Sequence, residues 1–269
     1  QIQGLFSHPG NPMEENMAVL IDNIRISDIP ALEVSQVGAA DHLPMVILVH
    51  GWSGHKEDML FLAYFLAVNN HFVVSLDAVG HGERLRKEDW TPEALLNLIQ
   101  QTAQEVNQVI AHYEGDARVD VQRVGLSGIS MGGVITYQYL SQENKRIRAA
   151  VPMIATPDFT SLIHGQNSGE IYTMLGLESQ TLVNALMLEM IQQLQPARRM
   201  SQMISVPLLM LNGVNDPLID LEGVRNFYRH IQPLYANPEE VRLIEYPGVG
   251  HYTPYGMQIE ALHWFQRFL

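Results

Sequence analysis

Apolar residues along this 269-residue chain gather into short runs, most of which end at a glycine or another turn-forming residue. A run of this kind is typical of a strand that is buried on both faces of a sheet. The runs lie at residues 45–49, 72–76, 121–126, 149–154, 206–211 and 241–246. Longer segments between or after them predict helices at residues 56–69, 91–114, 133–140, 221–231 and 255–269.

This alternation of strand and helix predicts an α/β fold with a mostly parallel sheet and helices on both of its faces. Residues 19–37 differ, because they form two short strand-like stretches with Pro30 near their junction. We expect them to be an antiparallel start to the same sheet, which brings the strands to eight. Ligand sites of such sheets lie at the carboxyl ends of the strands.

The alternation is interrupted once, between residues 155 and 203, where no strand is apparent. Residues 179–194 in this stretch carry a broad apolar face at helical spacing. We therefore predict a single domain over residues 1–269, with a helical cap inserted at residues 155–203. Methionines of the insertion could contact an apolar substrate, because thioether side chains adapt to irregular apolar surfaces. The candidates are Met174, Met187 and Met190, for which ordinary helix packing is the alternative.

Charge narrows the classes of partner. The chain has 16 Lys and Arg residues against 29 Asp and Glu residues, a formal net charge of −13. Nucleic acid and anionic membranes would be repelled, so we expect neither as a partner. We expect a cytoplasmic location, because no apolar run reaches the roughly 20 residues that span a bilayer and residues 1–16 lack the pattern of a signal peptide. Association into a homo-oligomer is left open.

Metal and thiol chemistry have little support in the sequence. The chain has no cysteine, which excludes disulfides, thiolate metal sites and a cysteine nucleophile. Its histidines are scattered without the spacing of metal ligands, so we expect no metal and no cofactor.

A candidate nucleophile lies directly after the apolar run at residues 121–126. The segment Gly128-Ile129-Ser130-Met131-Gly132 reads as G-x-S-x-G, the sharp turn from strand to helix that exposes a serine hydroxyl above a sheet. Ser127 is a rival that fails this pattern, because Ile129 takes the place of its second glycine. Ser130 is therefore the predicted nucleophile.

Nucleophilic acyl transfer by a serine also needs a base and an acid that orients the base. Asp216 follows the apolar run at residues 206–211, and His251 follows the run at residues 241–246. Both therefore lie at carboxyl ends of predicted strands, and the order Ser130, Asp216, His251 is the one expected when the serine lies on this turn. Asp220 and His263 are the alternatives for the acid and the base.

These motifs, together with His50-Gly51-Trp52 and residues 77–82, resemble the α/β-hydrolase superfamily over residues 45–269. Within it, the chain looks like the compact bacterial serine esterases related to prolyl-oligopeptidase and dienelactone-hydrolase domains. The resemblance implies the α/β-hydrolase fold, with the cap before the strand that precedes the catalytic aspartate. It also implies that Ser130 is the nucleophile, His251 the general base and then acid, and Asp216 the orienting carboxylate.

By the same resemblance, an oxyanion hole would use the backbone N–H groups of Met131 and Trp52. The family's H-G-G-G variant is replaced here by His50-Gly51-Trp52-Ser53, which favours the simpler set of donors. We expect His50 to shape this loop rather than to carry protons. We expect His81 to be a turn residue beside the site and Asp77 to fix its loop.

The sequence thus predicts a cofactor-free serine hydrolase, most simply a carboxylesterase for small-molecule esters with small-to-medium apolar acyl groups. An exopeptidase, an amide hydrolase or a thioester hydrolase could use the same triad. A binding protein that keeps the fold without catalysis is the alternative from another class, because fold alone does not establish activity.

Overall fold

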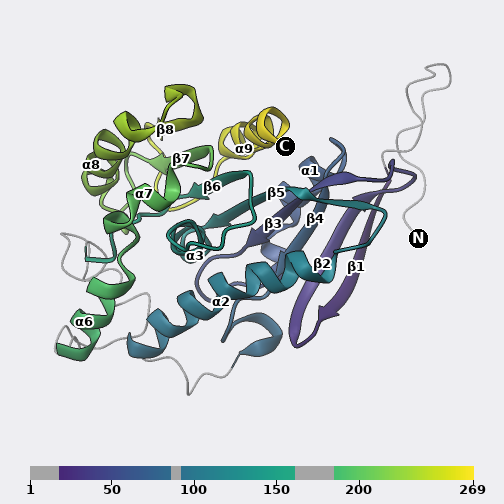
Figure 1. The fold of residues 1–269 in the computed structure, drawn as a ribbon, viewed down its shortest axis with the longest axis horizontal. Coiled ribbons are helices and arrows are strands. Elements are labelled where there is room, and N and C mark those ends of the chain that lie inside the picture. Colours follow the sequence, from purple (N-terminus) through teal and green to yellow (C-terminus); the bar gives the residue numbers. More distant parts are fainter. Residues whose placement is uncertain (1–17, 86–91, 161–184) are drawn as a thin grey trace.

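An eight-stranded sheet forms the centre of the molecule (Figure 1). The computed structural model describes residues 18–85, 92–160 and 185–269. Within them the strands lie in the order β1-β2-β4-β3-β5-β6-β7-β8. Their bounds are Val19–Ile26 (β1), Ile29–Gln36 (β2), Leu43–Val49 (β3), Phe72–Leu76 (β4), Val119–Ile129 (β5), Ala149–Met153 (β6), Leu208–Gly213 (β7) and Val241–Tyr246 (β8).

Strands β3 to β8 pair in parallel with one another, whereas β1 with β2 and β2 with β4 pair antiparallel. This confirms the predicted mostly parallel sheet and its antiparallel start. Because these strands are parallel, the carboxyl ends of β3, β4, β5, β6, β7 and β8 lie along one edge of the sheet. Loops from distant parts of the chain meet at this edge.

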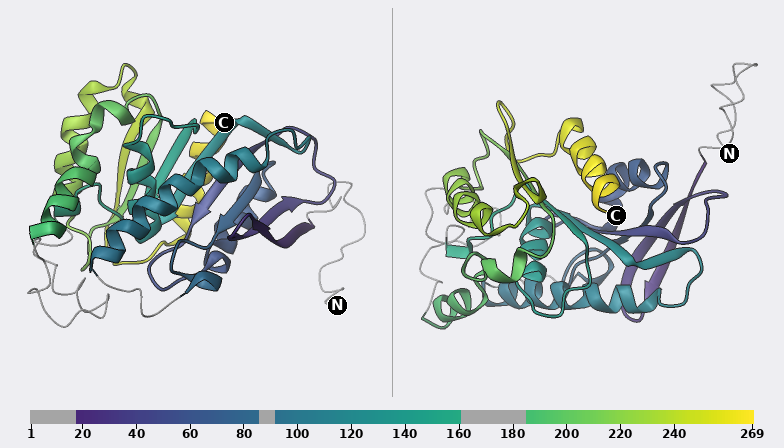
Figure 2. Two further views of the ribbon diagram at one scale, coloured as in Figure 1. Left: turned by 60° about the horizontal axis from the view of Figure 1, so that its bottom comes forward. Right: turned by 45° about the horizontal axis from the view of Figure 1, so that its top comes forward.

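Helices cover both faces of the sheet (Figure 2). One face carries α2 (Pro92–His112), α3 (Met131–Leu140) and α8 (Leu221–Ile231), whose buried residues join one core cluster. The other face carries α1 (Leu60–Ala67) and α9 (Tyr255–Phe268), which join a second cluster. Short 3-10 helices connect these elements: η1 (Lys56–Met59), η2 (Gly82–Arg84), η6 (Gln232–Leu234) and η7 (Pro238–Glu240).

Strand β3 shows why its apolar run is continuous. Met45, Ile47 and Val49 point into the first cluster, while Val46 and Leu48 point into the second. All five are fully buried. Burying one such aliphatic side chain contributes about 1.5–3 kcal/mol, so both faces of this strand stabilise the sheet.

The predicted cap at residues 155–203 is described only in part. Its described residues include α6 (Ala185–Leu194), η5 (Pro196–Arg198) and α7 (Met200–Met203). Met174 and the side chains of Met187 and Met190 lie outside the described residues, so their proposed contact with substrate stays a prediction. Among the helices in the described ranges, none is both long and apolar enough to cross a membrane.

Candidate active site

Ser130 lies between β5 and α3, with a backbone φ of 55° that non-glycine residues rarely adopt. The two glycines of the turn leave the space that this conformation needs. A Cβ atom on Gly128 would lie 2.2 Å from the backbone of Gly132, and one on Gly132 would lie 2.1 Å from the carbonyl oxygen of Val49. The turn therefore packs backbone against backbone, and this closeness holds the serine at the carboxyl end of β5.

Ser130, His251 and Asp216 form one continuous line of hydrogen bonds. Nε2 of His251 lies 2.7 Å from Oγ of Ser130, and Nδ1 of His251 lies 2.8 Å from Oδ2 of Asp216. The other oxygen of Asp216 accepts hydrogen bonds from the backbone N–H groups of Leu218 and Ile219. With Nδ1–H donating to the carboxylate, Nε2 is left to accept the serine proton.

The loops after β7 and β8 hold Asp216 and His251 together. The N–H of Asn215 donates to the carbonyl of Val249 over 2.9 Å. Its side-chain oxygen accepts from the N–H of Gly248 over 2.9 Å. Since Asn215 directly precedes Asp216 and Gly248 precedes His251 by three residues, these bonds fix the acid against the base.

The alternative residues have other positions. Ser127 is fully buried and donates its hydroxyl to the carbonyl of Val151. Asp220 is the N-cap of α8, where it accepts from the N–H of Glu222. His263 is exposed on α9. The structure therefore brings together the three residues predicted as the triad and none of these rivals.

Both predicted oxyanion donors belong to segments that border Ser130. Met131 is the first residue of α3, and the first N–H groups of a helix have no partner within it. A Cβ atom on Gly51 would lie 3.6 Å from the Cβ atom of Ser130, so the loop carrying Trp52 passes beside the serine. The oxyanion hole itself stays a prediction.

His50 ties the loop after β3 to the loop after β4. Its Nε2 accepts a hydrogen bond from the N–H of Ala78 over 3.1 Å, and its Nδ1 lies 2.7 Å from the carbonyl oxygen of Gly51. Burial lowers the pKa of His50 to about 4, so the ring is neutral near pH 7. A neutral ring with both nitrogens engaged suits a residue that shapes its loop.

His81 belongs to the loop after β4, the loop to which His50 is bonded. Its ring packs against the Trp52 indole in a T-shaped arrangement, with the ring centroids 4.9 Å apart. Among the described residues no group of three or more histidine, aspartate and glutamate side chains is arranged to hold a metal ion.

Lys56 is a residue of this region that we did not predict from the sequence. Its side chain is only 3% exposed and lies among carboxylates of the loops after β3 and β4. No local pattern indicates that burial, because a lysine at the start of a predicted helix normally faces water.

Comparisons with known proteins find likenesses to hydrolases. A family model described as "Serine aminopeptidase, S33" matches residues 40–158, which include Ser130 but neither Asp216 nor His251. The Bacillus subtilis protein named "Putative esterase YitV" is 29% identical over 262 residues, which are 93% of this chain and 100% of that protein.

Solved structures extend the likeness to nearly the whole chain. A Thermus thermophilus crystal structure matches with a TM-score of 0.75 and 20% identity, over 93% of this chain and 98% of the other. A Pyrococcus furiosus esterase matches with a TM-score of 0.64 and 17% identity, over 93% of each chain. The sheet order, the serine turn and these likenesses show that the chain has the α/β-hydrolase fold and is similar to hydrolases with this fold.

Proposed function

We propose that this protein is a serine hydrolase that cleaves carboxylic esters through an acyl-enzyme on Ser130. The observation that carries the proposal is the hydrogen-bonded line from Ser130 through His251 to Asp216 at the carboxyl edge of the sheet. Three residues far apart in the sequence meet there in the geometry that activates a hydroxyl for acyl transfer.

Each group has one part in the reaction. As Oγ of Ser130 attacks the ester carbonyl, Nε2 of His251 takes its proton, and Asp216 stabilises the imidazolium that forms. The negative oxygen of the tetrahedral intermediate would face the N–H groups of Trp52 and Met131. The C–O bond to the alcohol breaks as His251 returns the proton to the alcohol. His251 then deprotonates a water molecule, which attacks the acyl carbon. The bond from that carbon to Oγ of Ser130 breaks as His251 returns the proton to Oγ, and the carboxylic acid leaves.

Esters are the preferred substrates in this proposal because the Bacillus subtilis relative, which is similar over its full length, carries an esterase name. We infer small-to-medium apolar acyl groups, enclosed by the cap proposed at residues 155–203, with Met174, Met187 and Met190 as the candidate contacts. The proposed chemistry uses neither a metal nor a cofactor, and we propose a cytoplasmic enzyme without nucleic-acid or membrane partners.

Amide cleavage is the second candidate, because the matching family model is described as a serine aminopeptidase. The same triad performs both reactions, and only the pocket and the leaving group differ. Thioesters share the acyl chemistry as well.

A substrate panel separates these activities. Wild type and Ser130→Ala are compared on p-nitrophenyl esters from acetate to dodecanoate and on an aminoacyl p-nitroanilide. We expect turnover of the esters with an optimum below the longest chains, and a fall in kcat of about a millionfold in Ser130→Ala because the triad acts as a unit. Preferred turnover of the anilide would transfer the proposal to a peptidase. Equal activity of both proteins would refute Ser130 as the nucleophile.

A further inference from the structure

The loop between β3 and η1 carries Trp52, whose N–H is one of the two donors in the proposed oxyanion hole. Residues 50–55 are not part of a regular helix or strand, and this loop passes beside Ser130. Stabilisation of an oxyanion requires that its donors be held in place before the reaction. The contacts that hold this loop therefore bear on catalysis.

Both ends of the loop are anchored at the carboxyl end of β4. At one end, the ring of His50 accepts from the N–H of Ala78. At the other end, the N–H of Lys56 donates to Oδ1 of Asp77 over 2.8 Å, and the carbonyl of Lys56 accepts from the hydroxyl of Ser75 over 2.6 Å. The loop thus spans two fixed points on one strand end.

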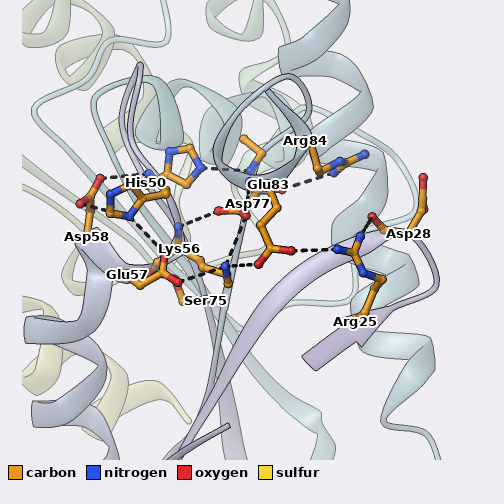
Figure 3. Close-up of polar contacts among 12 residues, drawn as sticks. Arg25, Asp28, His50, Lys56, Glu57, Asp58, Ser75, Asp77, Glu83 and Arg84 are labelled. Atoms are coloured by element: carbon orange, nitrogen blue, oxygen red, sulfur yellow. Dashed lines mark hydrogen bonds and ion pairs between the residues drawn. The ribbon is translucent and has the colours of Figure 1, made fainter. Parts of the chain in front are cut away.

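Asp77 is held as firmly as the loop that it anchors. Its side chain is fully buried, and Oδ2 accepts from the N–H of Glu83 over 2.9 Å. Gly82 makes room for this carboxylate, because a Cβ atom there would lie 2.1 Å from Oδ1. The carboxylate therefore joins the loop after β3 to the loop after β4 (Figure 3).

The side chain of Lys56 closes the same connection from within. Its ammonium lies 2.7 Å from Glu83, 3.0 Å from Glu57 and 3.6 Å from Asp77 (Figure 3). Burial opposes the charge of this ammonium, but its hydrogen bonds to Glu83 and Glu57 raise the pKa of Lys56. The lysine therefore stays charged and holds three carboxylates around one point.

A buried ion cluster is weak ground for stability, since apolar side chains of similar size often hold a core equally well. Its distinct effect is on position, because the charge and the hydrogen bonds fix the path of the backbone between β3 and η1. We propose that Lys56, Asp77 and Glu83, here called the loop anchor, are positioning residues that hold the N–H of Trp52 in the oxyanion hole. This inference rests on the proposed function and adds to it the residues that position the N–H of Trp52.

The test compares wild type with Lys56→Met and Glu83→Ala. Arg25→Ala is the matched control, because the hydrogen bonds of Arg25 go to the carbonyl of Asp28 and, over 2.8 Å, to the outer oxygen of Glu83, and not to residues 50–55. If Lys56→Met fails to fold, Glu83→Ala carries the test, because the Glu83 side chain is 41% exposed and its loss leaves a milder defect. Four quantities are measured: kcat and KM for p-nitrophenyl acetate, Ki for an aryl trifluoromethyl ketone, and amide hydrogen exchange of residues 50–55.

The ketone adds to Ser130 and places an oxyanion in the hole, so it reports the donor's position. We expect kcat to fall roughly 10- to 100-fold in both anchor variants, because displacing a donor costs somewhat less than removing it. The Ki should rise by the same factor, KM should stay within about twofold, and exchange of residues 50–55 should accelerate. Arg25→Ala should match wild type in all four quantities.

A loss of thermal stability with kcat, Ki and exchange equal to those of Arg25→Ala would overturn the proposal and leave a structural cluster. A rise in KM alone would overturn it as well. Absence of ester turnover in wild type would instead defeat the proposed function. Hydrogen exchange does not depend on turnover, and unchanged exchange of residues 50–55 would then still refute the loop anchor.

Discussion

The carboxylate of Asp216 makes two kinds of contact with its two oxygens. Oδ1 accepts from two backbone N–H groups and so fixes the plane of the carboxylate, while Oδ2 accepts from His251. The first contact is structural and the second sets which nitrogen of His251 carries the proton. A substitution that changes only the second therefore tests the role of the residue.

Asp216→Asn is that substitution. The amide oxygen can still accept from Leu218 and Ile219, but the amide nitrogen would face Nδ1 of His251 and favour the wrong tautomer. We expect kcat for p-nitrophenyl acetate to fall about 10⁴-fold with the thermal unfolding midpoint nearly unchanged. Wild-type turnover by a folded Asp216→Asn protein would remove Asp216 from the proposed triad.

Single functional residues could be predicted where their neighbours in the sequence form a recognisable pattern. The turn glycines around Ser130, and the position of Asp216 and His251 just after apolar runs, are visible in the sequence, and the structure brings the three side chains together. The burial of Lys56 leaves no local mark, because the carboxylates around it include Asp77 and Glu83 from another loop. Such a contact exists only once β3 and β4 lie side by side.

At the scale of elements, apolar runs locate the strands well but not their ends. Strand β5 extends over Val119–Ile129, beyond the predicted residues 121–126, because it begins two residues earlier and continues through Ser127 and Gly128, which interrupt the apolar pattern. The helix predicted at residues 56–69 is divided into η1 and α1. The start of the helix predicted at Thr91 lies outside the described residues, and α2 is described from Pro92.

Helix α8 supplies a control for the triad. Its N-cap Asp220 lies only four residues beyond Asp216, yet its side chain bonds the N–H of Glu222 and no part of the triad. Asp220→Ala should lower the free energy of unfolding by about 1 kcal/mol, the usual effect of losing such a cap. Urea titration measures this loss, and kcat should remain that of wild type. A large fall in kcat would contradict this assignment, because it would show that Asp220 takes part in the reaction.

At the scale of the whole molecule, the parallel sheet assembles the site. The loops after β3, β4, β5, β7 and β8 come from segments up to about two hundred residues apart in sequence, and the strand order places their ends along one edge. Two core clusters fix this edge from both faces. The fold could be predicted because strand and helix alternate along the sequence. The cap at residues 155–203 stays a prediction, because residues 161–184 lie outside the described residues.

The free energy of unfolding should depend on pH through His50. Its pKa is lowered from 6.5 to about 4 by burial, so on acidification the unfolded chain binds a proton that the folded protein does not. Stability from this group is therefore complete above about pH 6.5 and is lost as the pH falls toward 4. The loss amounts to roughly 2 kcal/mol at about pH 5.

Urea unfolding of wild type and His50→Gln at about pH 7.5 and about pH 5 measures this term. His71 and His81, whose pKa values burial also lowers, remain in both proteins and cancel. Wild type should lose more stability than the variant between the two pH values, by roughly 2 kcal/mol. An equal loss in both proteins would mean that His50 is not held neutral by the fold.

The most direct measurement of the central claim is covalent labelling by a fluorophosphonate, followed by peptide mass mapping. Because the reagent captures a serine activated by its neighbouring base, we predict one label per chain, on the peptide that contains Ser130, with ester hydrolysis lost in proportion. Ser130→Ala should take up no label and His251→Ala should react far more slowly. Labelling of another residue, or full ester turnover in a protein whose Ser130 stays unlabelled, would contradict the account.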